Sequence, residues 1–329
     1  TICQNQSINL QASGATTYVW NTNDTTSSII VSPTSTTTYT VTGSNTYGCS
    51  NSVSVTVTVY PNPTVSITPN NPSICLNNSI TLSASGGISY LWNTGNSSQN
   101  ITVTPLVSTT YTVTVTDINT CSASNNVVVT VYSTPPANAG ADQNICEGTS
   151  TQLNASGGIT YAWSPSTGLS NSSISNPIAN PSITTTYTVT ITDVNGCYAT
   201  DDVVITVLPI PIINILPSSG KICVGDTITI NANGAITYNW TPSIGLSSDT
   251  SATTIAQPSV TTTYTVTGAN QYGCTNYNSI TISVEPLPIL TISPNVAGVC
   301  SGQSINISVN GAANYIWAPS TGLSSTTGS

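Results

Sequence analysis

Charge is the scarcest property of this chain. Only 3% of the 329 residues are charged, with one lysine or arginine against ten acids, and the net charge is −9. Because no basic cluster could neutralise phosphates, the composition argues against nucleic acid as a partner. It also argues against binding to anionic lipid surfaces. Thr, Ser and Asn side chains must therefore provide most of the contact with water.

Histidine is absent, as is any Cys-x-x-Cys pair, so a cysteine-rich zinc site is not supported. Catalysis needs a base, a nucleophile or a metal. Lys221 stands alone, and the many serines have no base candidate nearby. Asp201 and Asp202 form the only adjacent acid pair, but neighbours on a strand point to opposite faces. We expect no enzyme activity, no cofactor and no metal.

Long apolar runs are also missing. The longest, residues 207–216, is interrupted by Pro209 and Pro211 and is too short to cross a bilayer. We therefore expect no membrane insertion in this segment. Runs with the 3.6-residue period of a helix are absent too. The sequence predicts an all-β fold.

Cysteines, by contrast, recur at near-constant intervals. Five of the nine are each followed 17 residues later by a tryptophan, and the other four each lie 10 residues after a tyrosine. The first set is Cys3/Trp20, Cys75/Trp92, Cys146/Trp163, Cys223/Trp240 and Cys300/Trp317; the second is Tyr39/Cys49, Tyr111/Cys121, Tyr187/Cys197 and Tyr264/Cys274. A repeat of about 75 residues is the size of a small domain that folds alone.

The repeat divides the chain into five units. The predicted boundaries are 1–60 for unit 1, which lacks a first strand, 61–133 for unit 2, 134–208 for unit 3, 209–285 for unit 4, and 286–329 for a partial unit 5. Neither end resembles a natural terminus, so we expect a longer parent protein. Prolines mark every joint, and short proline-stiffened joints favour an extended rod.

Within each unit, apolar residues alternate with polar ones, as in strands with one buried face. The most regular strand is Thr-Thr-Tyr-Thr-Val-Thr, in which Tyr and Val point inward. Another strand carries Tyr and Trp two residues apart, on one face. We predict an antiparallel immunoglobulin-like sandwich of about seven strands. Its core should contain Trp20, Trp92, Trp163, Trp240, Trp317, Tyr39, Tyr111, Tyr187 and Tyr264. An exposed sugar-stacking platform is the competing interpretation of the Tyr/Trp pairs.

The regular spacing of the cysteines indicates a disulfide framework, which implies an oxidising, extracellular setting. Pairing within units would give Cys3–Cys49, Cys75–Cys121, Cys146–Cys197 and Cys223–Cys274, with the partner of Cys300 outside the chain. In a standard immunoglobulin sandwich these turns lie at opposite ends, too far apart to bridge. A single strand between Trp20 and Tyr39 would bring them to one end, and we favour that arrangement. Otherwise the bridges join successive units, for example Cys3–Cys121.

Asp117 and Asp193 occupy turns and have the chemistry of calcium ligands. The corresponding residues in units 1 and 4 are taken to be Gly43 and Gly268, which cannot ligate through a side chain. A turn-capping role is therefore favoured over calcium.

Three segments resemble a known family. Residues 139–148 (AGADQNICEG), 153–163 and 186–197 resemble the start and end of a PKD-like domain. The cysteine-bearing version is similar to tandem repeats of very large surface proteins of Bacteroidota, including gliding-motility adhesins, over nearly the whole chain. The resemblance implies type IX secretion, a cell-surface or extracellular location, and O-glycosylation, for which Thr25 and Thr227 lie in matching Asp-Thr motifs.

Two functions remain open. In the first, the chain is a structural or adhesive segment, a disulfide-stiffened stalk or filament whose partners are neighbouring copies or repeats of the same protein. In the second, the repeats themselves bind polysaccharide or external surfaces.

Overall fold

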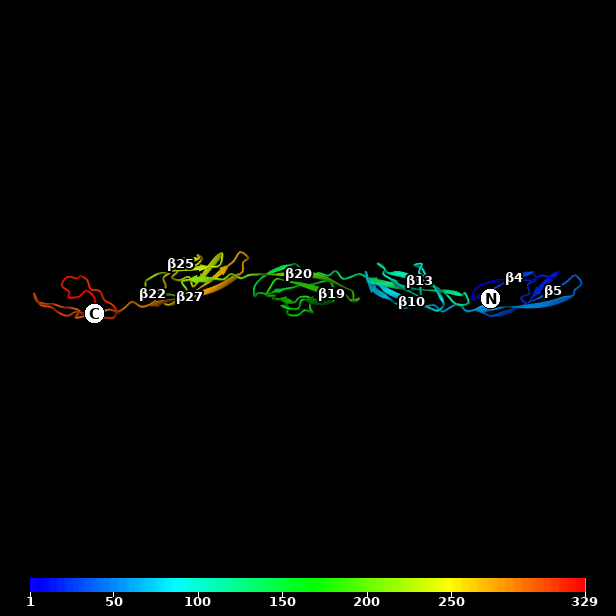
Figure 1. The fold of residues 1–329 in the computed structure, drawn as a ribbon, viewed down its shortest axis with the longest axis horizontal. Helices are drawn as coiled ribbons and strands as arrows, with labels where there is room; N and C mark the ends of the chain where they lie inside the picture. Colours follow the sequence, from blue (N-terminus) through cyan, green and yellow to red (C-terminus); the bar gives the residue numbers. More distant parts are fainter. Residues whose placement is uncertain (329) are drawn as a thin grey trace.

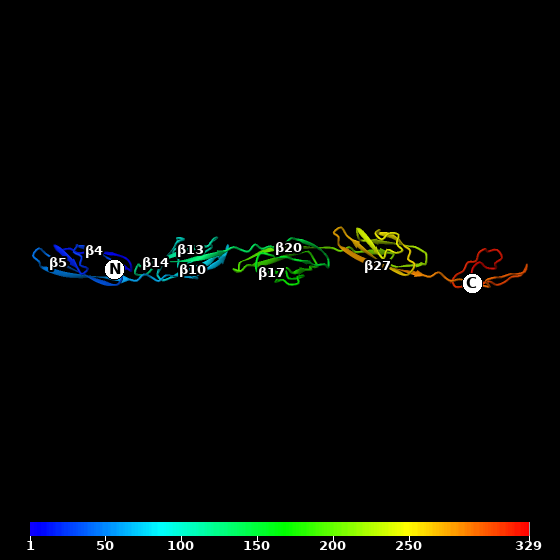
Figure 2. The ribbon, with the colours of Figure 1, turned by 180° about the vertical axis from the view of Figure 1, so that it is seen from behind.

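The computed structural model describes residues 1–328. Over these residues it contains 29 β-strands and no helix. Figures 1 and 2 show the strands gathered into separate bodies that follow one another in single file, from the first unit (blue) to the last (red). The all-β, tandem, extended architecture expected from the sequence is confirmed.

Units 2 and 4 each contain seven strands in two sheets. The strands of unit 2 are β8 (Ser66–Thr68), β9 (Ser73–Cys75), β10 (Ile80–Ser85), β11 (Ser89–Trp92), β12 (Asn100–Val103), β13 (Thr109–Thr116) and β14 (Ser122–Tyr132). Those of unit 4 are β21 (Asn214–Leu216), β22 (Gly220–Cys223), β23 (Ile228–Asn233), β24 (Thr237–Thr241), β25 (Thr253–Ala256), β26 (Thr262–Ala269) and β27 (Thr275–Glu285). One sheet has three strands, with the opening strand (β8 or β21) at its edge, and the other has four.

The four-stranded sheet departs from the expected antiparallel sandwich in one strand. β9 runs parallel to the closing strand β14, and β22 runs parallel to β27. The other strand pairs of this sheet are antiparallel in both units. This parallel strand carries the first cysteine of its unit, so its direction decides where that cysteine lies.

Units 1 and 3 are variants of the same sandwich. Unit 3 contains β15 (Gln143–Cys146), β16 (Thr151–Gln152), β17 (Thr160–Ser164), β18 (Ile178–Ala179), β19 (Thr185–Thr192) and β20 (Tyr198–Leu208). Its opening segment is reduced to a bridge between Asn138 and Ser156. Unit 1 contains β1 (Ile2–Cys3), β2 (Ile8–Gln11), β3 (Thr17–Trp20), β4 (Ser28–Val31), β5 (Thr37–Ser44), β6 (Ser50–Val57) and β7 (Val59–Tyr60). In the described residues of the partial unit 5, 286–328, the strands are β28 (Thr291–Ser293) and β29 (Ser308–Asn310).

Each complete unit has a core built around its tryptophan and its strand tyrosine. Trp20, Trp92, Trp163 and Trp240 are buried, and so are Tyr39, Tyr111, Tyr187 and Tyr264. Trp317 differs, because it is only half-buried in the partial unit 5. Every indole N–H is satisfied by a backbone carbonyl: Trp20 donates to Thr26, Trp92 to Ser98, Trp163 to Ile174, Trp240 to Ser251 and Trp317 to Gly328. The four buried indole rings are thus packing elements and offer no stacking face.

The outward faces of the long strands are lined by hydroxyl groups. Thr38 pairs with Thr56 across β5 and β6, Thr40 with Ser54, and Thr42 with Ser52, at 2.8–3.0 Å. Cross-strand hydroxyl pairs of this kind stabilise a sheet surface without charge.

Candidate functional site

The joints between units carry the chemistry of this chain. In units 1 to 4 the first cysteine ends the strand that runs parallel to the closing strand. Cys75 pairs with Tyr132 at the end of β14, and Cys146 pairs with Leu208 at the end of β20. The first cysteine therefore lies at the end where the chain leaves the unit.

The second cysteine lies at the other end. Cys121 immediately precedes Ser122, the first residue of β14, in the turn from β13. β14 has 11 residues, and at about 3.3 Å per residue it is roughly 35 Å long. A disulfide needs Cα atoms within about 7 Å. Cys75 and Cys121 therefore cannot bond to each other.

The disulfides instead join successive units. Cys3 bonds to Cys121, Cys75 to Cys197 and Cys146 to Cys274, with Cα–Cα distances of 5.5, 5.5 and 5.6 Å. The favoured pairing within units, Cys3–Cys49, Cys75–Cys121, Cys146–Cys197 and Cys223–Cys274, is wrong. A single strand, β4, does separate the Trp and Tyr strands of unit 1, as its length suggested. The prediction was wrong because the first-cysteine strand runs parallel to the closing strand, which places the first cysteine at the opposite end of the unit from the second. The number of strands does not reveal this direction.

Three cysteines have no bond and are exposed: Cys49, Cys223 and Cys300. Cys223 does not bond to Cys274, because Cys274 is bound to Cys146. A partner for Cys300 outside the chain stays a prediction.

A side-chain cap shapes the turn that holds the second cysteine. In unit 3, Oδ1 of Asp193 accepts hydrogen bonds from the backbone N–H groups of Asn195 and Cys197, at 2.8 and 2.9 Å. Asp117 makes the same two bonds to Asn119 and Cys121. Because one of these bonds is to the cysteine itself, the cap fixes the position of the sulfur at the joint.

The cap also corrects the alignment behind the calcium argument. Strand pairing aligns Gly43 with Val115, two residues before Asp117. The true counterparts of Asp117 and Asp193 are Asn45 and Asn270, which cap their turns in the same way. In residues 1–328 no three His, Cys, Asp or Glu side chains gather in a group that could hold a metal ion.

Asp201, one member of the acid pair of unit 3, also has a structural role. Oδ2 of Asp201 accepts a hydrogen bond from the backbone N–H of Ala139, at 2.8 Å, and so holds the opening segment of the unit. Asn125 and Asn278 occupy the equivalent positions of units 2 and 4 and donate to the carbonyls of Val65 and Ile213. No sequence pattern indicates this anchor, because the residue type at this position differs among the units.

Residues 1–328 contain no helix that could span a membrane. The one ion pair of this part of the chain joins Lys221 to Glu285 at 3.0 Å beside Cys223, with both side chains largely exposed. Such a surface pair contributes little to stability.

No protein-family model matches the chain, and no curated protein sequence matches it. Among solved structures, it is similar to the N-terminal eight immunoglobulin domains of Down Syndrome Cell Adhesion Molecule, with 16% identity over 94% of this chain and 57% of that one, and a TM-score of 0.24. It thus spans little more than half of that fragment.

Two further structures are similar to the chain. Titin domains I67–I69 match with 13% identity over 68% of this chain and 98% of that one, with a TM-score of 0.36. Sidekick-1 immunoglobulin domains 1–5 match with 12% identity over 87% and 78%, with a TM-score of 0.26. The two-sheet topology of units 2 and 4 and the bonds between successive units make the chain an all-β array of tandem immunoglobulin-like sandwiches joined by disulfides.

Proposed function

We propose that the chain is a structural segment of a secreted surface protein, a stalk or filament in which tension is carried by covalent bonds. The observation that carries the proposal is the bonding of each unit to the next by a disulfide as well as by the backbone. Two covalent connections at a joint restrict both bending and twisting. A spacer or fibre needs this property, and a set of independent binding modules does not.

The disulfides create a short covalent path through the array. From Cys3 the path crosses to Cys121, follows the backbone to Cys146, and crosses to Cys274. It therefore uses only 25 backbone residues (146 minus 121), whereas the backbone from Cys3 to Cys274 has 271 (274 minus 3). These 25 residues contain β14 and β15, which are already extended.

The path is already close to its full length in the folded protein. Twenty-five extended residues span about 85 Å at most. They cross two sandwiches whose closing strands, β14 and β20, have 11 residues each and are each roughly 35 Å long. Covalent bonds therefore bear tension along the array before the cores of units 2 and 3 can unfold.

Single-molecule stretching with handles at the two ends tests the proposal. The oxidised chain should release almost no length between Cys3 and Cys274. After reduction, units 1 to 4 should unfold in separate steps that together release most of the 271-residue backbone between Cys3 and Cys274. Long unfolding steps from the oxidised chain, of the same size as those after reduction, would refute a covalent load path.

The chain offers a matched pair of variants for this test. Cys146→Ser with Cys274→Ser lengthens the shortest path to 123 residues, 46 between Cys121 and Cys75 and 77 between Cys197 and Cys274. Cys75→Ser with Cys197→Ser removes a disulfide that lies off the shortest path. The first double variant should become extensible, and the second should remain as short as the parent.

The cellular location, the secretion route, the glycosylation sites and the unit boundaries are part of the same proposal. The disulfides fit an oxidising compartment, and the resemblance to gliding-type adhesins suggests type IX secretion and a role at the cell surface. Thr25 and Thr227 are exposed, as O-glycosylation requires. The unit boundaries at 60, 133, 208 and 285 fall after closing strands and are proposed as the limits of the repeats.

Binding of polysaccharide or of an external surface is the second candidate. It is favoured by Tyr47, whose side chain is 91% exposed at the tip of a turn, and by the exposed Tyr272 at the equivalent position of unit 4. Units 2 and 3 have Asn119 and Asn195 there instead. A glycan array with the intact chain, and with Tyr47→Ser and Tyr272→Ser together, tests this candidate: hits that the double variant loses would support it.

A further inference from the structure

Three asparagines of this chain are followed directly by glycine: Asn195, Asn233 and Asn310. In such a pair the backbone nitrogen of the glycine can attack Cγ of the asparagine side chain, and the approach is unhindered because glycine has no side chain. The reaction converts the asparagine to an acid without an enzyme. The three pairs are alike in sequence, so only their places in the fold distinguish them.

Asn195 lies in the exposed turn that holds Cys197 at the joint between units 2 and 3. The backbone N–H groups of Asn195 and Cys197 donate to Oδ1 of Asp193, at 2.8 and 2.9 Å. The N–H of Gly196 donates to the carbonyl oxygen of Asp193 at 3.2 Å, the longest of the three bonds. A Cβ added to Gly196 would have no neighbouring atom within 4 Å. The attacking nitrogen is therefore weakly held, and the space around Gly196 is open.

Asn233, by contrast, is held in a sheet. It is the last residue of β23 and pairs with Asn214 of β21, the opening strand of unit 4. Gly234 is covered by the opening segment, because a Cβ added to it would overlap the carbonyl oxygen of Ile212. Asn310 has the same setting in the partial unit 5. The opening segment therefore confines the backbone at both of these pairs.

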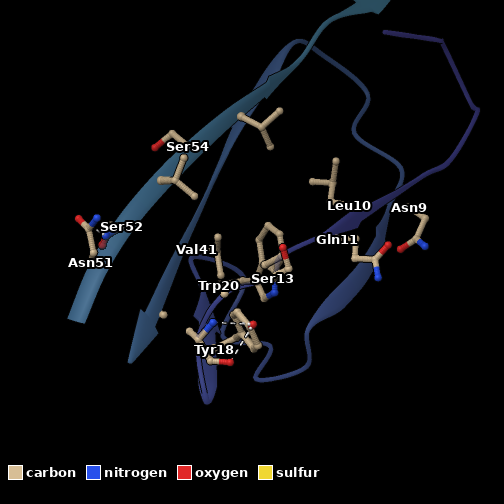
Figure 3. A pocket seen from close by; sticks show the side chains of 16 residues that line it. Asn9, Leu10, Gln11, Ser13, Tyr18, Trp20, Val41, Asn51, Ser52 and Ser54 are labelled. Atoms are coloured by element: carbon tan, nitrogen blue, oxygen red, sulfur yellow. Dashed lines mark hydrogen bonds between the residues drawn. The ribbon is translucent and has the colours of Figure 1, made fainter. Parts of the chain in front are cut away.

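A tyrosine hydroxyl fixes the turn that follows Gly234. The hydroxyl of Tyr238 accepts a hydrogen bond from the N–H of Ala235 at 3.0 Å and donates to the carbonyl oxygen of the same residue at 2.9 Å. Figure 3 shows the equivalent arrangement in unit 1, where dashed lines mark the bonds of Tyr18 with the N–H and carbonyl of Ala15. Closing a ring between Asn233 and Gly234 therefore requires the turn and the opening strand to separate.

We propose that Asn195 is a site of spontaneous deamidation in the folded protein. The nitrogen of Gly196 forms a bond to Cγ of Asn195, the bond from Cγ to the amide nitrogen breaks, and ammonia leaves with the proton of the Gly196 N–H. Water then opens the resulting succinimide ring at either carbonyl, which gives aspartate or isoaspartate. The inference does not depend on the load-bearing role, since the turn is the same in an extensible array.

Conversion at Asn195 changes the turn that positions Cys197. Isoaspartate adds a carbon atom to the backbone between Asp193 and Cys197, so the bond from the N–H of Cys197 to Asp193 loses its geometry. Either product also places a second carboxylate near that of Asp193, and like charges repel. The disulfide from Cys197 to Cys75 is not affected by the reaction. The joint between units 2 and 3 therefore loosens with age while its covalent bond stays.

Peptide mapping of the intact, oxidised chain after incubation in heavy-oxygen water tests the proposal, because each acid formed during the incubation carries the label. In the folded chain, Asn195 should react at least about tenfold faster than Asn233, since the reaction at Asn233 must wait for the opening strand to separate. After reduction, thiol blocking and transfer to urea, the two should react at similar rates. Equal rates in the folded chain would overturn the proposal, and so would an unchanged ratio in urea, which would assign the difference to sequence.

The turn of unit 2 offers a matched variant. Asn119 donates to Asp117 as Asn195 does to Asp193, but the residue after it is Thr120. Thr120→Gly should raise the rate at Asn119 by about tenfold or more, because it removes the branched side chain from the attacking residue. An inert Asn119 in this variant would show that the turn does not permit ring closure, which contradicts the proposal.

Hydrogen exchange at the amide of Cys197 tests the effect on the joint. Protection of this amide should fall by about tenfold in the aged chain, because its bond to Asp193 is lost. Asn195→Gln is the control, since it keeps the backbone bonds of the turn while its longer side chain closes the ring far more slowly. After the same incubation, this variant should keep the protection of the fresh chain. Unchanged protection in a chain that carries isoaspartate at position 195 would overturn the effect on the turn.

Discussion

At the scale of single residues, a few side chains do the same task in every unit. The buried tryptophan donates its indole N–H to the loop between the Trp and Tyr strands, and this bond survives a change in loop length. The acceptor lies six residues after Trp20 but 11 after Trp163. A fixed donor with a variable loop explains why tryptophan recurs while the intervening sequence does not.

One turn residue lies in an unfavourable conformation. Thr120 has a φ of 67°, where the equivalent residues Gly48, Gly196 and Gly273 have φ of 84°, 80° and 81°. A β-branched residue is strained there. We predict that Thr120→Gly stabilises unit 2 by about 1 kcal/mol. Chemical denaturation followed by tryptophan fluorescence measures this, and a destabilised variant would show that Thr120 makes a compensating contact.

Two buried tyrosines predict sensitivity to alkali. Desolvation by burial raises the pKa of Tyr187 and of Tyr264 above the ordinary value of 10.0. The folded state then holds these protons more tightly than the unfolded state does, so the free energy of unfolding falls as the pH rises above about 10. The loss continues until the pH passes the folded-state pKa.

Urea unfolding at about pH 9 and about pH 11 tests whether the free energy of unfolding falls as the pH rises. The Tyr187→Phe, Tyr264→Phe double variant should lose less stability between the two values than the parent does. Tyr47→Phe, at an exposed tyrosine, should behave as the parent. An equal loss in the double variant would show that other groups cause the alkaline effect.

At the scale of elements, the opening strand is held by its contact with a turn glycine. An added Cβ at Gly234 would overlap the carbonyl oxygen of Ile212, whereas one at Gly14 meets nothing within 4 Å. Both glycines have positive φ, 100° and 95°. A side chain at either glycine would therefore carry the same backbone strain, and only one at Gly234 would also collide with the opening strand.

Alanine at these two glycines separates the two effects. Gly14→Ala should destabilise unit 1 by about 1 kcal/mol, from its φ alone. Gly234→Ala should destabilise unit 4 by about 2 kcal/mol more, because the opening strand must also move. Denaturation curves of the two variants give the difference, and equal losses would mean that the strand yields without cost.

The same scale shows what the sequence could and could not predict. Alternating Val, Tyr and Thr predicted the long strands, because a two-residue period directly reports a half-buried face. No such pattern reports the direction of the short strand ending at Cys75, because a strand of three residues can pair either parallel or antiparallel. The wrong disulfides followed from that one undetermined direction.

At the scale of the whole molecule, the load path runs through the sandwiches. The first-cysteine and closing strands contribute buried residues to the cores, such as Ile145 of β15 and Val203 of β20. Together with the disulfides, these strands join the units into the single file of Figure 1. On the chain-entropy account, cross-links with sequence separations of 118–128 residues each stabilise by up to about 5 kcal/mol. The three loops overlap, so each disulfide also limits the unfolding of its neighbours' units.

Mass-spectrometric mapping of disulfide-linked peptides from the unreduced, thiol-blocked protein tests the central claim most directly. The account predicts linked peptides for Cys3–Cys121, Cys75–Cys197 and Cys146–Cys274, with Cys49, Cys223 and Cys300 recovered as blocked thiols when these 329 residues are produced alone. Recovery of Cys75 linked to Cys121, or of Cys146 linked to Cys197, would contradict it.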